Sequence, residues 1–438
     1  SHVNEFVNRF ESLWRKLGIE YDDFIRTTES RHINRVKELL SLLHNKGEIY
    51  SAEYEGLYSV SEERFITEKE YEEGSFREIK KLNERNYFFK MSNYQDALVE
   101  HINNNPDFIK PETRKNEILG FLKKPLNDLC ISRPKSRLSW GIEIPFDKDY
   151  VTYVWFDALM NYINAVGWNI DDKKFNQWWP AEYHLIGKDI LTTHAVYWST
   201  MLLAADLPLP KTILAHGWWL IGEDKISKSL GNAVNPLDLI DNYGVDSVRY
   251  FLMRDMVLGN DANFYMESFI KRYNSDLAND YGNLVNRVTM LIHKNFGGLI
   301  PISGDYDKLD FSVLEKAKNT PNKVRKNFNL LKIHDAIENI LSLIRELNRY
   351  LEKREPWKLV KSDKSQASIA ATTLAISADI LRISSQLLNP VMPEKTKDIL
   401  GILGCDRISV NNTEIGLLKA GTKLGKGQSP FPRIEIKL

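Results

Sequence analysis

The chain has 438 residues, enough for about three domains of ordinary size. Its 43% hydrophobic and 27% charged residues are typical of a folded globular protein and exclude a disordered or collagen-like chain. Basic and acidic side chains are equal in number, 59 of each, so any nucleic-acid binding must come from a local basic surface.

Cysteine content and hydropathy narrow the class further. Only Cys130 and Cys405 occur, which excludes a disulfide framework and a cysteine-based zinc site. No apolar run reaches the roughly 20 residues of a membrane span, and the polar, helical first residues do not read as a signal peptide. We therefore expect a soluble, multidomain protein of a reducing compartment.

The first third of the chain predicts helices on either side of an inserted β-rich segment. Apolar residues at three- and four-residue spacing predict helices over 3–17 and 33–43, the second with Thr28 as its N-cap. Between Glu48 and Glu78 the pattern changes to short aromatic strands with many glutamates, which indicates an insertion. Helical patterns return over 93–101 and 113–122.

The rest of the chain changes from alternating strands and helices to helices alone. Short apolar strands at 151–155, 184–186 and 213–215 alternate with helices, which is typical of a parallel sheet. From about Met266 onward, long amphipathic helices predict a bundle. These helices are expected at 269–294, 311–327, 334–354, 368–388 and 395–403, and the tail from Lys419 is expected to lie over the surface.

The sharpest local signal is the run Lys225-Ile226-Ser227-Lys228-Ser229-Leu230-Gly231-Asn232. Its two lysines flank a small hydroxyl residue in a polar loop, and lysine ammonium groups suit polyphosphate. A bare pair of lysines at this spacing is more often a solvated surface loop, so by itself the run leaves both interpretations open.

The complete run resembles the KMSKS signature of class I aminoacyl-tRNA synthetases, with isoleucine in place of methionine. The resemblance implies that Lys228 contacts the ATP phosphates and that Lys225 assists it, with Ile226 and Ser227 also at the nucleotide. The preceding run Leu214-Ala215-His216-Gly217-Trp218-Trp219 also matches the family and implies three further nucleotide residues, which are His216, Gly217 and Trp218.

Two segments resemble the methionine pocket of methionyl-tRNA synthetases. They are Tyr153–Tyr162 (YVWFDALMNY) and Gly187–Trp198 (GKDILTTHAVYW). The resemblance implies that Asp189 binds the substrate ammonium group, and aromatic rings suit a thioether side chain. The side-chain pocket would be lined by Trp155, Ala158, Leu159, Tyr162, Ile190, His194 and Trp198. Taken alone, the first segment is typical of an aromatic core strand, and a lone histidine beside tryptophan is more often structural. Thr193 stands where many members carry an aromatic residue.

Two segments of the helical part resemble the anticodon-reading elements of the same family. The run from Arg272 to Arg287 implies that Asn283 and Arg287 face the anticodon, and Glu355-Pro356-Trp357-Lys358 implies that Trp357 stacks on a base. Stacking combined with hydrogen bonds is how proteins read single-stranded RNA. Taken alone, Trp357 would be a packing residue at a helix end.

The resemblance implies an α/β fold, with a Rossmann-like class I catalytic domain, an inserted connective domain and an all-α anticodon-binding bundle. The expected domains are the end of the first half of the catalytic domain (1–46), the connective domain (47–135), the second half of the catalytic domain (136–222), the KISKS loop and stem-contact region (223–266), the helical bundle (267–405) and the tail (406–438).

The expected function is that of a methionine–tRNA ligase, which activates L-methionine with ATP to methionyl-adenylate and transfers it to tRNA(Met). We expect a cytoplasmic monomer without a membrane partner, with Mg²⁺ accompanying ATP. The run Tyr58–Phe65 has no cysteines where many members bind zinc, so we predict no zinc and no other protein-bound metal.

Two alternatives stay open at this stage. The family's HIGH signature does not occur in these residues, so the chain could be a catalytically incomplete fragment or paralogue that binds tRNA. It could also be a class I synthetase for another apolar amino acid.

Overall fold

The computed structural model of the chain describes residues 2–59, 64–66, 71, 78–221, 224–225, 235–427 and 429–435. The chain divides into two compact units. Unit A comprises Tyr21–His216, and unit B comprises Ser1–Glu20 together with Gly217–Leu438. The six expected domains are a finer division than this one and stay a prediction.

Unit A begins with helix α2 (Ser30–Asn45), which buries one apolar stripe in the core of the unit. The stripe of Val36, Leu39, Leu40 and Leu43 is at most 1% exposed, as the sequence periodicity predicts. The predicted N-cap Thr28 was wrong, because the helix begins one residue later, after Glu29.

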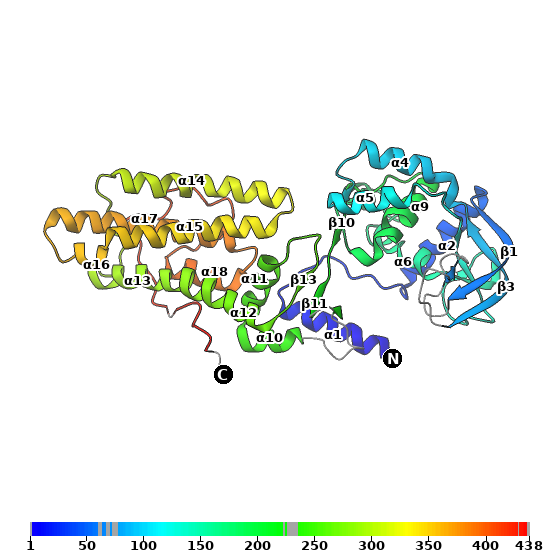
Figure 1. Cartoon of the computed structure of the whole chain (residues 1–438), viewed down its shortest axis with the longest axis horizontal. Coiled ribbons are helices and arrows are strands. Elements are labelled where there is room, and N and C mark those ends of the chain that lie inside the picture. Colours follow the sequence, from blue (N-terminus) through cyan, green and yellow to red (C-terminus); the bar gives the residue numbers. More distant parts are fainter. Residues whose placement is uncertain are drawn as a thin grey trace. The chain divides into compact units, whose positions relative to one another are not determined.

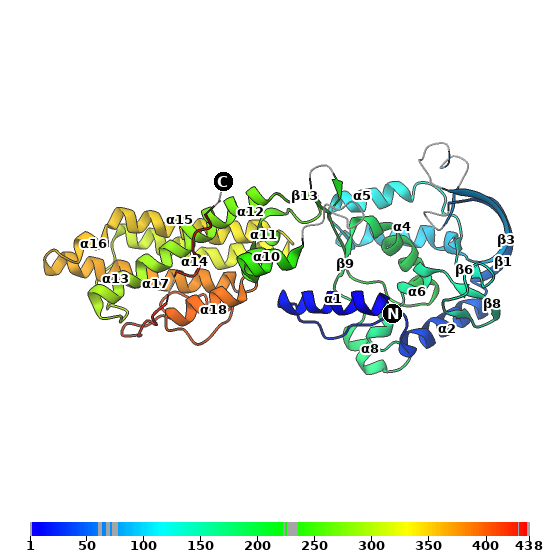
Figure 2. The same ribbon diagram turned by 90° about the horizontal axis from the view of Figure 1, so that it is seen from below.

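An antiparallel sheet follows α2 and confirms the β-rich segment. Its long strands β1 (Ile49–Ser59) and β3 (Ile79–Phe89) pair along their whole length, and Figure 2 shows them as one curved ribbon. The shorter strands β2 (Arg64–Ile66) and β5 (Leu129–Cys130) complete the order β2-β1-β3-β5.

The strand predicted at 151–155 was half wrong. Strand β8 (Asp147–Thr152) pairs with β6 (Ser132–Pro134) and β7 (Glu143–Ile144) and ends at Thr152. Helix α6 (Val154–Ala158) begins two residues later. A short apolar run does not distinguish a strand from a buried helix, because both place apolar side chains against the core.

The predicted parallel sheet is present in unit A. Strand β10 (Ile213–His216) lies between β4 (Ile109–Lys110) and β9 (His184–Gly187), and both pairings are parallel. Helix α5 (Glu112–Phe121) contacts β4, and unit A also contains α4 (Gln95–Asn104), α7 (Asn161–Ala165), α8 (Asp172–Trp178) and α9 (Ser199–Ala204).

Unit B contains a small mixed layer of short strands. Strand β11 (Trp219–Ile221) pairs with β12 (Asp224–Lys225) and with β13 (Ala262–Asn263). Helices α1 (His2–Lys16), α10 (Pro236–Tyr243) and α11 (Val245–Asp255) also belong to this unit.

The rest of unit B is the predicted helical bundle, and Figure 1 shows α14, α15 and α17 lying side by side. Its elements are α12 (Met266–Arg272), the π-helix η5 (Tyr273–Gly282), α13 (Asn283–Phe296), α14 (Lys308–Asn329), α15 (Ile333–Arg354), α16 (Pro356–Leu359), α17 (Lys364–Leu388) and α18 (Pro393–Ile402). The helix predicted over 269–294 is therefore interrupted by a π-helical stretch, which side-chain periodicity does not reveal.

Helix α17 is the central helix of the bundle. By length and composition it could cross a membrane, but 78% of its most apolar window is buried inside the protein, as in the core helix of a bundle. Its buried ion pair between Arg382 and Asp379 (2.7 Å) holds the tail, since Asp379 accepts hydrogen bonds from the backbone of Gly416 and Leu418. The tail from Lys419 was predicted to lie over the surface, but Leu424 and Phe431 are buried in the bundle core.

Candidate functional site

The carboxyl ends of β9 and β10 bring two predicted site residues together. Parallel strands end at the same edge of a sheet, and His216 pairs with Gly187 in register. A Cβ atom on Gly187 would lie 2.5 Å from Oδ1 of Asp189 and 3.9 Å from Cε1 of His216. The Asp189 carboxylate and the His216 imidazole therefore both lie beside this glycine, and exposed Asp189 is accessible to a cationic group.

A chain of hydrogen bonds joins three of the predicted methionine-pocket residues. The hydroxyl of Tyr162 lies 2.8 Å from Nε2 of His194, and Nδ1 of His194 lies 2.8 Å from the carbonyl oxygen of Ile190. Since a carbonyl only accepts, the ring hydrogen of His194 is on Nδ1, and Nε2 accepts from Tyr162. Trp155 meets the His194 ring edge-on at 6.4 Å between centroids.

Burial keeps this pair uncharged. It raises the pKa of Tyr162 to about 12 and lowers the pKa of His194, which is 3% exposed. Both effects follow from the cost of placing a charge in a poorly solvated place. The pair of Tyr162 and His194 is therefore neutral. The exposed carboxylate of Asp189 lies on the short 3-10 helix Lys188–Ile190, which follows β9.

His184 on β9 is a second pocket histidine that the sequence analysis missed. Its ring stacks on Tyr162 at 4.0 Å, and its Nε2 accepts a hydrogen bond from the indole of Trp198 at 3.1 Å. Burial lowers the pKa of His184 to about 3, so it is neutral at physiological pH. Its place three residues before the Gly-Lys-Asp run was the available signal, but only the fold shows that its ring backs Tyr162.

The remaining predicted pocket residues differ in exposure. Ala158 and Ile190 are half-buried. Leu159 is 1% exposed and Trp198 is fully buried, and both belong to the core of unit A. The Trp198 ring lies directly beside Tyr162, with 6.2 Å between the ring centroids, and its indole also donates to His184.

His194 and Trp198 lie on a π-helix, η3 (Thr193–Trp198), and not on the ordinary helix that the sequence predicts. Such π-helical turns are often found at functional sites. The hydroxyl of Thr193 donates to the carbonyl oxygen of Ile190 at 2.7 Å, so this side chain binds its own helix.

The nucleotide segment is described only in part. Lys228, Ile226 and Ser227 lie outside the described residues, and Lys225 is placed only as a strand residue of β12 that pairs with Leu220. His216 ends β10 in unit A. Gly217 and Trp218 begin unit B, where the backbone N–H of Trp218 donates to Asp261 at 2.8 Å.

Gly217 is required by a close backbone approach. A Cβ atom there would lie 2.1 Å from the carbonyl oxygen of Asn260 and 2.6 Å from the nitrogen of Asp261. Any other residue would collide with main-chain atoms, which have no alternative rotamer. This explains one glycine of the His-Gly-Trp-Trp run by packing alone.

The bundle brings Arg287 and Trp357 together across 70 positions of sequence. The Arg287 guanidinium carbon lies 5.9 Å from the centre of the Trp357 ring, within cation–π range. The guanidinium donates to Oδ1 of Asn348 at 2.9 Å, and Asn348 in turn donates to the carbonyl oxygen of Asp280. Burial lowers the pKa of Arg287, and Asn283, one turn earlier on α13, is exposed.

Glu355 sets the direction of the segment that carries Trp357. It has φ +44° and ψ +51°, a left-handed conformation that is unfavourable for a residue with a side chain. Pro356 follows at the first position of α16, and Trp357 is half-buried on that helix. The chain thus reverses sharply between α15 and α16, which brings Trp357 to Arg287.

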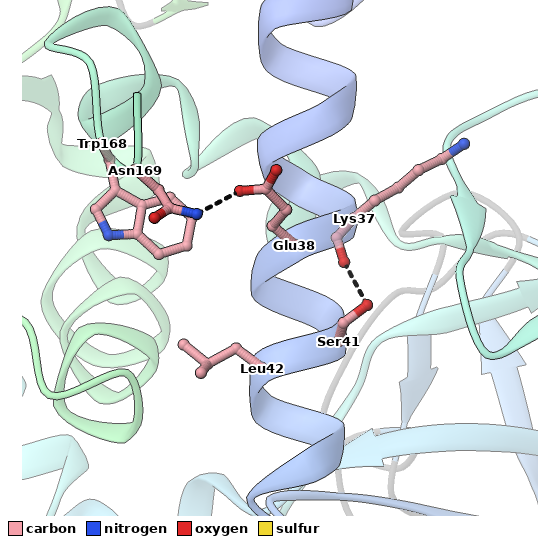
Figure 3. A pocket seen from close by; sticks show the side chains of 6 residues that line it. All are labelled: Lys37, Glu38, Ser41, Leu42, Trp168 and Asn169. Carbon is pink, nitrogen blue, oxygen red and sulfur yellow. Dashed lines mark hydrogen bonds between the residues drawn. The ribbon is translucent and has the colours of Figure 1, made fainter. Parts of the chain in front are cut away.

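A cavity of about 420 Å³ lies elsewhere on unit A (Figure 3). It is lined by Lys37, Glu38, Ser41, Leu42, Trp168 and Asn169. Asn169 crosses it to donate a hydrogen bond to Glu38 at 2.7 Å. None of the predicted site residues lines this cavity.

Comparison with protein families assigns both parts of the chain. Residues 1–75 and 74–289 match the family described as tRNA synthetases class I (M), and residues 300–435 match the anticodon binding domain of methionyl tRNA ligase. The methionine–tRNA ligase of Clostridium acetobutylicum is 42% identical over 443 residues, covering 100% of this chain and 68% of that protein. The enzyme of Fusobacterium nucleatum is 42% identical over 447 residues, covering 99% of this chain and 70% of its own.

Solved structures agree with these relatives. Mycobacterium tuberculosis methionyl-tRNA synthetase in complex with methionyl-adenylate superposes with a TM-score of 0.91 at 39% identity, covering 97% of this chain and 85% of that one. Its apo form gives 0.90 at 37% identity, with 99% and 87% covered. The expected class I synthetase fold with a helical anticodon-binding domain is confirmed, and a class I enzyme for another amino acid is not supported. The chain belongs to the methionyl-tRNA synthetase family.

Proposed function

We propose residue roles for the reaction of this family, the ligation of methionine to its tRNA. In this reaction the methionine carboxylate attacks the α-phosphorus of ATP and pyrophosphate leaves. A ribose hydroxyl of tRNA(Met) then attacks the activated carbonyl carbon, and AMP leaves. Neither step forms a bond to the protein, so the chain acts by orientation and by stabilising charge.

The neutral pair of Tyr162 and His194 carries the methionine assignment. A thioether side chain is unbranched, uncharged and polarisable, and it packs favourably against aromatic rings. Trp155 and Tyr162 supply such rings, and burial holds the neighbouring histidine neutral. Asp189, exposed two residues after the end of β9, would pair with the substrate ammonium group.

The nucleotide would bind through the lysine run, with Lys228 as the main phosphate contact and Lys225 beside it. Mg²⁺ would enter with ATP, because it prefers phosphate oxygens and retains several waters. Within the described residues no group of three His, Cys, Asp or Glu side chains could hold a metal. The absence of zinc stays a prediction, since most of the run Tyr58–Phe65 lies outside those residues.

The tRNA anticodon would bind at α13 and α16. Trp357 offers a ring for stacking, and exposed Asn283 offers amide hydrogen bonds one turn before Arg287. Arg287 is held by Asn348, so its guanidinium is oriented before RNA arrives. A cytoplasmic monomer without membrane contacts completes the proposal.

The decisive experiment is Asp189→Asn in the full-length protein, assayed by methionine-dependent ATP–pyrophosphate exchange. A charge-assisted hydrogen bond contributes about 1.5–3 kcal/mol, so the KM for methionine should rise roughly 10- to 100-fold, with the KM for ATP unchanged. Asp172→Asn, an exposed carboxylate of α8, is the matched control.

Equal KM values in the two variants would contradict the role of Asp189. A wild-type protein that binds tRNA(Met) without any exchange activity would instead favour the tRNA-binding paralogue.

A further inference from the structure

His32 is a fully buried histidine to which no role has been given above. It lies in the first turn of α2 and is 0% exposed. Its Nε2 is 2.5 Å from a carboxylate oxygen of Asp157, and the amide nitrogen of Asn164 is 3.0 Å from its Nδ1. Because the Asn164 amide donates to Nδ1, the ring hydrogen is on Nε2 and is donated to Asp157. Both ring nitrogens are thus used, each toward a different element.

The two partners of His32 belong to the helices that carry the aromatic walls of the pocket. Asp157 lies on α6 two residues after Trp155, and Asn164 lies on α7 two residues after Tyr162. Each of these helices has only five residues. A helix that short does not hold its own position in water, so its placement depends on tertiary contacts. Helix α2, with 16 residues and a buried apolar stripe, is a firm support.

We propose that His32 is a positioning residue that fixes the spacing between Trp155 and Tyr162, and through that spacing the selectivity for an unbranched side chain. The inference depends on the proposed methionine site. One imidazole ties α6 to α7, so loss of either bond lets the two walls move independently. A displacement of about 1 Å in a binding site costs up to a hundredfold in rate, which sets the scale of the expected effect.

The test uses two variants of the full-length protein. One keeps a single hydrogen-bonding position of the imidazole, and the other keeps neither. His32→Gln retains an amide donor near the position of Nε2, and His32→Leu retains neither contact. Exchange of pyrophosphate into ATP is measured with L-methionine and with L-leucine. For His32→Leu we expect kcat/KM for methionine to fall roughly 10- to 100-fold. The preference for methionine over leucine should narrow, and the KM for ATP should stay within about twofold. His32→Gln should recover part of the loss.

A matched control separates positioning from general stability. Leu43→Val changes a residue of the same helix that is also 0% exposed, 11 positions or about 16 Å further along α2. The thermal unfolding midpoint is measured for all variants. Asn164→Ala removes only the hydrogen bond between His32 and α7, and it therefore tests the same connection from the other side.

The outcomes are distinct. The proposal is overturned if the His32 variants and Leu43→Val change methionine selectivity equally for the same loss of unfolding temperature. It is also overturned if Asn164→Ala leaves selectivity untouched. Failure of the proposed function shows differently, as a wild-type protein without methionine-dependent exchange.

Discussion

Gly217→Ala should disrupt the backbone junction that follows β10. The new methyl carbon would lie 2.1 Å from the carbonyl oxygen of Asn260, whereas ordinary contacts of this kind begin at 3.4 Å. The two segments must therefore separate by about 1.3 Å at this contact. Because the opposing atoms belong to the main chain, no side-chain rotation relieves the collision.

The cost can be worked out from the hydrogen bonds that this separation breaks. Three of them cross the junction at 2.8–2.9 Å. The backbone N–H of Ala262 donates to the carbonyl oxygen of Trp218, and that of Phe264 donates to the carbonyl oxygen of Leu220. The backbone N–H of Trp218 donates to the carboxylate of Asp261. Each contributes about 1 kcal/mol net, and overpacking adds about 1–3 kcal/mol. We expect the local free energy of opening to fall by about 4–6 kcal/mol.

Amide hydrogen exchange followed by mass spectrometry measures this loss directly. Peptides covering residues 213–221 and 256–265 should exchange at least 100-fold faster in Gly217→Ala than in the wild type. Gly401→Ala is the control, because it makes the same substitution inside a helix of the same unit with open space around it. That change should leave exchange unchanged or slower, since alanine is the better helix former. Protection in Gly217→Ala within fivefold of the wild type would refute the close approach.

Three further predictions concern unit B. Arg287→Lys loses the hydrogen bond to Asn348 and should raise the KM for tRNA in the aminoacylation assay about 5- to 30-fold, while the rate of pyrophosphate exchange stays unchanged. An equal loss of activity in aminoacylation and in exchange would contradict an anticodon role. Glu355→Gly relieves the left-handed strain and should raise the free energy of urea unfolding by up to about 1 kcal/mol, whereas Glu355→Val should lower it by about 1–2 kcal/mol. Burial raises the pKa of Asp246 from 3.8 to about 6. Between these pH values the folded state binds more protons than the unfolded state, so the contribution of Asp246 to the free energy of unfolding falls as pH rises. Asp246→Asn still accepts the hydrogen bond from the backbone of Lys395 but cannot titrate. The unfolding free energy of this variant should therefore fall by about 2–3 kcal/mol less than that of the wild type between pH 4 and pH 7. Equal pH slopes for the two proteins would contradict the prediction.

Local patterns were sufficient for most elements and failed at identifiable places. The stripes of α2 and α15 have the periodicity of an amphipathic helix, and the structure buries those residues. The strand predicted through Trp155 failed at Thr152, where a strand gives way to a short helix. The π-helices η3 and η5 were also missed, because widening a turn by one residue leaves the apolar pattern almost unchanged.

The candidate site shows the same division. Sequence motifs named Tyr162, His194 and Asp189, and the structure brings the first two into hydrogen-bonding contact. The sequence analysis did not identify His184 or His32. His184 had only its place before the Gly-Lys-Asp run as a signal, and no local pattern distinguishes a buried histidine such as His32 from an exposed one. Their roles depend on partners between 14 and 132 positions away.

The sequence by itself determined the family, the class of fold and the identity of the motif residues, because motifs and apolar periodicity are properties of neighbouring positions. Only the tertiary structure decided which pocket side chains are neutral and which residues hold the pocket walls in place. Neutral His194, the stacking of His184 and the link through His32 depend on burial and on contacts between distant segments. The same holds in the bundle, where the strained turn at Glu355 brings Trp357 to Arg287, since only a folded chain can hold a residue in an unfavourable conformation.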